Sequence, residues 1–170
     1  LAMKITRYAP AMLFNTIKGF PNYRMLVNQM GSPGRLCHTL GIEGSRTSLM
    51  EVVKLWRERF STLKPLPYRT VADGPIRENV YTGHDVHLSR IASPLWHERD
   101  GGRYPGTACM VITRDPDTAV VNIGTYRVME HDDTSLAFYI SQGKDGRMHR
   151  ESYFKQGNPC PVAVCFGQHP

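Results

Sequence analysis

Residues 64–76, which begin KPLPYRTVADGP, interrupt the chain and constrain its fold more than any other feature. Proline lacks the backbone N–H that a helix needs, and its ring clashes with the preceding turn, so Pro65, Pro67 and Pro75, together with Gly74, exclude a helix there. Before this break apolar residues recur at helical spacing, and after it they form short runs typical of strands. We therefore predict two modules, 1–85 and 86–170, with the linker 64–76 inside the first.

The first module is predicted to combine two short strands with two helices. The apolar runs AMLFN (11–15) and MLVN (25–28) flank the turn-rich KGFPN, as two strands of a small sheet would. A helix should follow in SPGRLCHTLG, with Ser32 as its N-cap and Gly41 as its stop. In SRTSLMEVVKLWRERFSTL, helical spacing relates the apolar residues Leu49, Val52, Val53, Trp56 and Phe60. A tryptophan at that spacing is usually a core residue, so we expect Trp56 in the core of a small α/β module.

The second module is predicted to be mainly β, which makes the whole chain α+β. Strands are expected in TACMVIT, TAVVNIGTYRVM, SLAFYI and PVAVCFG, at 107–113, 118–129, 135–140 and 161–167. Between the last two, DGRMHRESYFKQG (145–157) indicates a short helix. Asp115, Pro116 and Asp117 are turn formers, so the first two strands should form an antiparallel hairpin.

The composition is typical of a folded chain with one sizeable core, since 41% of its 170 residues are hydrophobic and 21% are charged. No window approaches the ~18 uncharged apolar residues needed to cross a bilayer, and LAMKITRYAP lacks the apolar core of a signal peptide. We therefore expect a cytoplasmic location and no membrane partner. The four cysteines form no CxxC pair, which favours free thiols.

The formal net charge of +6 suits a phosphorylated cofactor, an anionic substrate or nucleic acid. The basic residues are spread thinly, however. Only KLWRER (54–59) is dense, and it looks like the solvated face of a helix. No nucleic-acid partner is expected.

Two polar residues, Asn122 and Arg127, stand out in the predicted strand 118–129. Side chains alternate along a strand, so residues five apart should point to opposite faces. Gly124 lies between them, and a glycine inside a strand often marks a bulge or a close backbone approach. A bulge would reset the alternation, and we expect both polar groups to face one pocket.

Four segments in order resemble the N-terminal and central parts of UbiD-like decarboxylases; they are LFNTIKGFP, VNQMGSPGRLCHTLG, DGGRYPGTACMVITRDPDTAVVNIGTYRVM and GRMHRESYFKQGNPCPVAVCFGQHP. The resemblance runs from Ala11 to Pro170. It implies a small N-terminal module followed by part of a split β-barrel flavin-binding domain. It also implies a lyase that uses prenylated FMN for the reversible, non-oxidative decarboxylation of an aromatic or α,β-unsaturated carboxylic acid. Such a lyase would act as a homo-oligomer, together with the remainder of the polypeptide or a partner subunit.

The same resemblance implies roles for individual residues. Asn122 and His149 match a pair that ligates a divalent metal, Mn²⁺ or Mg²⁺, which also holds the cofactor phosphate next to a K⁺ ion. Arg127 matches a catalytic arginine beside the flavin and the substrate carboxylate. The cofactor-binding residues implied are Asn122, Ile123, Gly124, Thr125, Tyr126, Arg127, Met148 and His149. The residue types agree, since a hard cation accepts oxygen and imidazole ligands and a guanidinium can hold a carboxylate through paired hydrogen bonds.

Other polar residues are expected outside the site. EHDD (130–133) is interpreted as a solvated loop, and His84 and His87 as structural or surface groups. His97 and Asp100 in WHERDGG receive no catalytic role. The glutamate that completes the metal site in the family, and the acidic pair that donates the proton, have no counterpart in this chain.

Three functions remain open from the sequence. The chain is a piece of a UbiD-like decarboxylase that is catalytic only with the rest, a flavin- or phosphate-binding module without decarboxylase activity, or a basic structural or nucleic-acid-binding domain.

Overall fold

A computed structural model describes residues 10–43, 48–64, 66–67 and 69–168. The chain divides into two compact units, Leu1–Val80 and Tyr81–Pro170, and both contain strands and helices or helical turns. Pro65 of the predicted linker and residues 45–47 of the second predicted helix lie outside the described residues. The mixed α and β content agrees with the expected α+β class.

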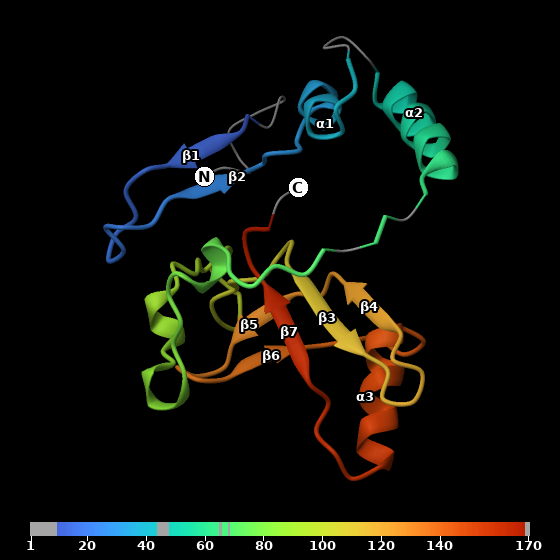
Figure 1. Ribbon diagram of the computed structural model, residues 1–170. Helices are drawn as coiled ribbons and strands as arrows, with labels where there is room; N and C mark the ends of the chain where they lie inside the picture. Colours follow the sequence, from blue (N-terminus) through green and yellow to red (C-terminus); the bar gives the residue numbers. More distant parts are fainter. Residues whose placement is uncertain (1–9, 44–47, 65, 68, 169–170) are drawn as a thin grey trace. The chain divides into compact units, whose positions relative to one another are not determined.

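The first unit begins with an antiparallel pair of strands, β1 (Met12–Phe14) and β2 (Met25–Val27), in which Met12 pairs with Val27 (Figure 1). Helix α1 (Pro33–Thr39) follows. The Ser32 hydroxyl accepts a hydrogen bond from the Arg35 backbone N–H at 3.4 Å, as an N-cap does, and Gly41 lies just past the helix with φ 60°. Both boundary signals of this helix are therefore confirmed.

Helix α2 (Leu49–Thr62) starts with a capping box. The Ser48 hydroxyl accepts from the Glu51 N–H at 3.3 Å, and the Glu51 carboxylate accepts from the Ser48 N–H at 2.7 Å. Only Val52 of this helix is buried, whereas Trp56 is 41% exposed. The expectation of a core tryptophan was wrong, because helical spacing selects a face of the helix without supplying an element that covers it.

The second unit holds a three-stranded antiparallel sheet in the order β4–β3–β7, formed by Val121–Gly124, Met110–Arg114 and Val162–Cys165. Strands β5 (Val128–Glu130) and β6 (Leu136–Phe138) pair separately. Helix α3 (Asp145–Lys155) packs against β3 and β4 (Figure 1). Single 3₁₀ turns cover Gly83–Asp85 and Leu88–Arg90 in this unit, and Pro75–Arg77 in the first unit.

The hairpin predicted around RDPDT is confirmed, since β3 and β4 pair antiparallel across it. Asp115 closes the turn, because its Oδ1 accepts from the N–H groups of Asp117 and Thr118 at 3.0 and 2.8 Å. The hydrogen bond from the Thr118 N–H is the largest cause of a lowered pKa of the Asp115 carboxyl, and the bond from the Asp117 N–H lowers it further. Beneath the strands lies a small core built on Cys109, Val111 and Val128, packed against Tyr126, Leu136, Phe138, Val164 and Phe166.

The single strand predicted over 118–129 is wrong, because the chain forms two strands there that belong to different sheets. Strand β4 ends at Gly124. Residues 125–127 turn away, and Val128 then pairs with Gly106, whose carbonyl accepts from the Val128 N–H at 2.8 Å. Both outer strands of the β4–β3–β7 sheet keep an open edge, so the described strands do not close into a barrel.

All four cysteines are free, as predicted, and two of them, Cys37 and Cys109, are buried. Burial raises the pKa of the Cys109 thiol, which also donates a hydrogen bond to the Tyr126 carbonyl at 3.1 Å. No helix within the described ranges combines the length and the apolar character needed to cross a membrane.

Candidate functional site

The site begins with a pair of polar residues that face each other across the β3–β4 hairpin. Thr113 of β3 and Asn122 of β4 are direct partners in the strand register. Direct partners project from the same face of a sheet, with Cβ atoms about 4.5–5.5 Å apart. Thr113 is 3% exposed, so the face that carries the pair is turned into the unit.

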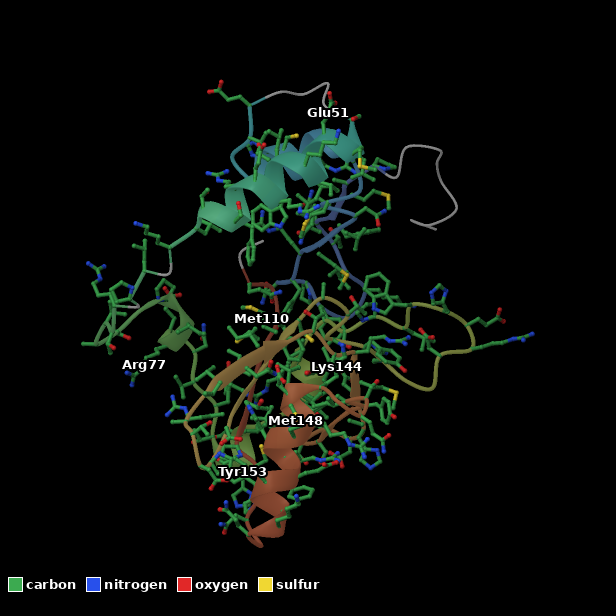
Figure 2. The ribbon with its side chains drawn as sticks, turned by 90° about the vertical axis from the view of Figure 1, so that its right-hand side faces the viewer. Glu51, Arg77, Met110, Lys144, Met148 and Tyr153 are labelled. Atoms are coloured by element: carbon green, nitrogen blue, oxygen red, sulfur yellow. The ribbon has the colours of Figure 1, made fainter. Side chains whose placement is uncertain are left out.

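Helix α3 brings His149 to the same face. Its ring is 6% exposed, and its Nδ1 lies 3.0 Å from the Thr113 hydroxyl oxygen. One turn earlier, Gly146 lies close to the other member of the pair, because a Cβ added there would lie 3.4 Å from the Asn122 Nδ2. Figure 2 shows α3 running from Lys144 at its start, past Met148, toward Tyr153 near its end. The fold thus brings Asn122 and His149 together although they come from different elements.

Both residues have polar atoms to offer a ligand. The Asn122 Nδ2 is buried without a hydrogen-bond partner within the described residues, and only Nδ1 of the His149 ring is hydrogen-bonded there. Nδ2 is a hydrogen-bond donor, and a buried donor without a partner costs about 1–3 kcal/mol, so this atom favours an acceptor from a bound group or water.

The donor set fits part of a divalent-cation shell. An amide oxygen and an imidazole nitrogen are acceptable ligands for a hard divalent ion, but such an ion takes six or more. Within the described residues no three His, Cys, Asp or Glu side chains gather as a metal site would require. Asn122 and His149 could therefore supply at most two ligands of such a shell.

Tyr126 closes one side of this region. A Cβ on Gly124 would overlap the Tyr126 phenol, and a Cβ on Gly146 would lie 3.2 Å from its hydroxyl. The phenol therefore lies against both β4 and α3, beside Asn122. Gly124 is a site of close approach, one of the two readings of a glycine inside a strand, and it marks the end of β4.

The structure does not bring every predicted site residue into this cluster. Arg127 lies exposed between β4 and β5, and no hydrogen bond or ion pair joins it to another described residue. Ile123 is 60% exposed on the opposite face of β4 from Asn122, and Thr125 and Met148 are exposed as well. For these four residues a role at the cofactor remains a prediction.

Several of the polar groups expected outside the site have structural partners, whereas His84 has none within the described residues. His87 Nδ1 lies 2.6 Å from the Asp133 carboxylate, whose other oxygen accepts from the Ser89 N–H at 2.8 Å. The hydrogen bond from the Ser89 N–H, followed by that from His87, lowers the pKa of the Asp133 carboxyl to about 2. The solvated loop is confirmed for residues 131–133, while Glu130 belongs to β5 and has a buried Oε1.

The sequence interpretation missed Thr113. Its signal was present in the hairpin, since the turn that joins β3 to β4 sets Thr113 opposite Asn122. Pairing the residues of the two strands outward from the turn would have identified Thr113 as the partner of Asn122, which the alternation of side chains within one strand does not show.

Comparisons with known proteins agree with this architecture. A model of the protein family described as UbiD: 3-octaprenyl-4-hydroxybenzoate carboxy-lyase Rift-related domain matches residues 69–170. A phenolic acid decarboxylase of Streptomyces sp. (strain D7) aligns with 98% of this chain at 32% sequence identity. A pyrrole-2-carboxylic acid decarboxylase of Pseudomonas aeruginosa aligns with 96% of this chain at 31% identity. The chain spans 35% and 34% of the length of these two relatives.

Two solved structures have similar folds. The vanillic acid decarboxylase of Sedimentibacter hydroxybenzoicus in its closed form matches 96% of this chain and 35% of its own, with a TM-score of 0.84 and 27% identity. The UbiD-class enzyme HmfF of Pelotomaculum thermopropionicum, in complex with FMN, matches 94% of this chain and 34% of its own, with a TM-score of 0.80 and 22% identity. The family match over residues 69–170, carried by the segment that contains Asn122 and His149, shows that the chain belongs to the UbiD family.

Proposed function

We propose that this chain is part of a decarboxylase that uses prenylated FMN for the reversible, non-oxidative decarboxylation of an aromatic or α,β-unsaturated carboxylic acid. The observation that carries the proposal is the meeting of Asn122 and His149 on one face of the second unit, next to Thr113 and Gly146. Relatives of this chain are decarboxylases of phenolic and pyrrole-2-carboxylic acids, and a structural neighbour was solved with prenylated FMN. The chain spans about a third of these proteins, so the whole activity belongs to a longer polypeptide or an assembly.

In this proposal the two ligands act together on the cofactor phosphate. The Asn122 carbonyl oxygen and a ring nitrogen of His149 would hold Mn²⁺ or Mg²⁺, and the charge of the metal, with K⁺ nearby, would offset that of the phosphate. Prenylated FMN, when bound, supplies an electron-accepting ring system for the electron pair of the breaking C–C bond. Strands from outside this chain would complete the split β-barrel around the flavin. The proposal also includes a cytoplasmic location and a homo-oligomeric assembly.

Arg127 has the proposed catalytic role of orienting the substrate. A planar guanidinium can hold a carboxylate through two parallel hydrogen bonds. Within the described residues Arg127 makes no hydrogen bond or ion pair that such a carboxylate would have to displace.

The test uses the full-length protein. We expect purified protein to show flavin absorbance, mass spectrometry of the extracted ligand to identify prenylated FMN, and CO₂ release from a panel of aromatic and α,β-unsaturated acids. His149→Ala should lower flavin content substantially, because one of few ligands is lost. His84→Ala is the matched control, since His84 is exposed and has no partner within the described residues.

The alternative is a flavin- or phosphate-binding module without decarboxylase activity. Bound flavin with no CO₂ release from any acid of the panel would favour that alternative. Protein without flavin, before and after incubation with the cofactor and Mn²⁺, would refute both.

A further inference from the structure

The Thr113 hydroxyl and the His149 Nδ1 lie 3.0 Å apart and share a hydrogen bond. We propose that Thr113 is the positioning residue of His149: its hydroxyl accepts the Nδ1 proton and thereby leaves Nε2 as the ring nitrogen that binds a divalent cation. The inference rests on the proposed function, because it concerns the orientation of a proposed metal ligand.

Thr113 is well placed to orient a ring. It lies on β3, the central strand of its sheet, where its backbone is paired with Asn122 on one side and Val162 on the other. Its side chain is 3% exposed, and a β-branched side chain in a strand has few accessible rotamers. The hydroxyl therefore holds a fixed position relative to β4.

The contact also bears on the proton of the imidazole. A neutral imidazole carries one proton, and a metal binds only the nitrogen that lacks it. Nδ1 faces the Thr113 hydroxyl at 3.0 Å, and Nε2 lies on the far side of the ring. When Nδ1–H donates to Thr113, Nε2 keeps its lone pair. Metal-binding histidines in proteins are commonly held by such an outer hydrogen bond.

Thr113 and Gly146 together place the ring next to Asn122. His149 and Gly146 lie three residues apart on one face of α3. His149 is hydrogen-bonded to Thr113, and a Cβ on Gly146 would lie 3.4 Å from the Asn122 Nδ2. Since Thr113 and Asn122 are direct partners across the hairpin, all four residues form one connected cluster. A hydroxyl on β3 thus aligns a ring on α3 with an amide on β4.

The experiment titrates Mn²⁺ alone into flavin-free, full-length protein and measures free Mn²⁺ by electron paramagnetic resonance. Removal of the hydroxyl by Thr113→Val should weaken Mn²⁺ binding about 10- to 100-fold, the range seen when such outer partners are lost. Thr113→Ala should do the same without the bulk of valine. Thr113→Ser keeps the hydroxyl, so its Kd should stay within about threefold of the wild type.

A double-mutant cycle separates positioning from a structural effect. If Thr113 acts through His149, then Thr113→Val should change the Kd for Mn²⁺ in wild type but not in a His149→Ala background. Ser93→Ala is the matched control, because the Ser93 hydroxyl is as buried as that of Thr113 but has no hydrogen-bond partner within the described residues. Melting temperatures without metal, measured for every variant, report structural damage separately.

Equal Mn²⁺ affinity in wild type, Thr113→Val and Thr113→Ala would overturn the inference and leave the proposed function intact. A loss of affinity that persists in the His149→Ala background, or that Ser93→Ala reproduces, would also overturn it. Wild-type protein that binds flavin and releases CO₂ without binding Mn²⁺ would refute the metal role of His149 together with the inference. Absence of flavin, Mn²⁺ and activity from the wild type would refute the proposed function itself.

Discussion

At the scale of single residues, the site contains polar atoms that have no hydrogen-bond partner within the described residues. A histidine on a short polar helix is usually exposed, yet His149 is buried and bonded to Thr113. Asn122 has its amide nitrogen enclosed without a partner. Asn122 as a whole is only half-buried, so burial restricts the His149 ring more than the Asn122 side chain.

Arg127 is predicted to orient the substrate and not to hold the cofactor. Arg127→Lys keeps the positive charge but loses the planar pair of donors, so turnover should fall about tenfold or more. Flavin content, measured by absorbance of the purified full-length protein, should stay unchanged. Arg99→Lys, an exposed change elsewhere in the second unit, is the control. An Arg127→Lys enzyme of undiminished rate would exclude the arginine from the mechanism.

Asp133 makes stability depend on pH. Its pKa of about 2 is below the ordinary value of 3.8, so the folded state binds its proton less readily than the unfolded chain does. The resulting stabilisation is complete above pH 4 and is lost as the pH falls toward 2. Asp133→Asn should therefore lower the melting temperature at pH 7, by a difference that shrinks below about pH 4.

The control for Asp133 is Glu98→Gln, an exposed carboxylate with no partner within the described residues. Melting curves at several pH values check both variants. A difference between wild type and Asp133→Asn that stays constant from pH 7 to pH 3 would show that the bonds to Ser89 and His87 do not depend on the charge.

At the scale of the elements, the end of β4 depends on one glycine. The Tyr126 phenol occupies the space that a side chain on Gly124 would need, and the Cys109 thiol holds the Tyr126 carbonyl at 3.1 Å. Gly124→Ala should therefore destabilise the protein by about 1–3 kcal/mol, as overpacking does. Urea unfolding of the full-length protein measures this.

Gly101→Ala is the matched control for Gly124→Ala, since a Cβ there meets only the Met129 sulfur at 3.8 Å, an ordinary contact. In a Tyr126→Ala background, Gly124→Ala should lose most of its effect because the phenol is gone. If Gly124→Ala is as stable as Gly101→Ala, then Tyr126 does not determine where β4 ends.

At the scale of the whole molecule, the chain spans about a third of the length of its relatives. The resemblance to the family implies an acidic pair that donates the proton, and the sequence offers no counterpart of that pair. General acid catalysis at neutral pH needs a carboxylic acid of raised pKa over the substrate carbon. We therefore expect the full-length protein, but not residues 1–170 alone, to release CO₂ from the acid substrates. CO₂ release by the 170-residue chain would show that its own residues donate the proton.

The sequence by itself determined what depends on neighbours along the chain. The cap at Ser32, the turn at Asp115 and the helix after Lys144 were predictable because their hydrogen bonds join residues a few positions apart. Four motifs in order along the chain, two of which contain Asn122 and His149, were sufficient to indicate the family.

Only the tertiary structure decided which of these residues meet. Thr113 and His149 are 36 positions apart, and no local pattern relates them. The break of the predicted strand at 125–127 follows from the Tyr126 ring and from the pairing of Val128 with Gly106. Trp56 is exposed because helical spacing places it on one face of α2 but does not place another element against that face. Each of these outcomes depends on contacts between distant segments, which form only when the chain is folded.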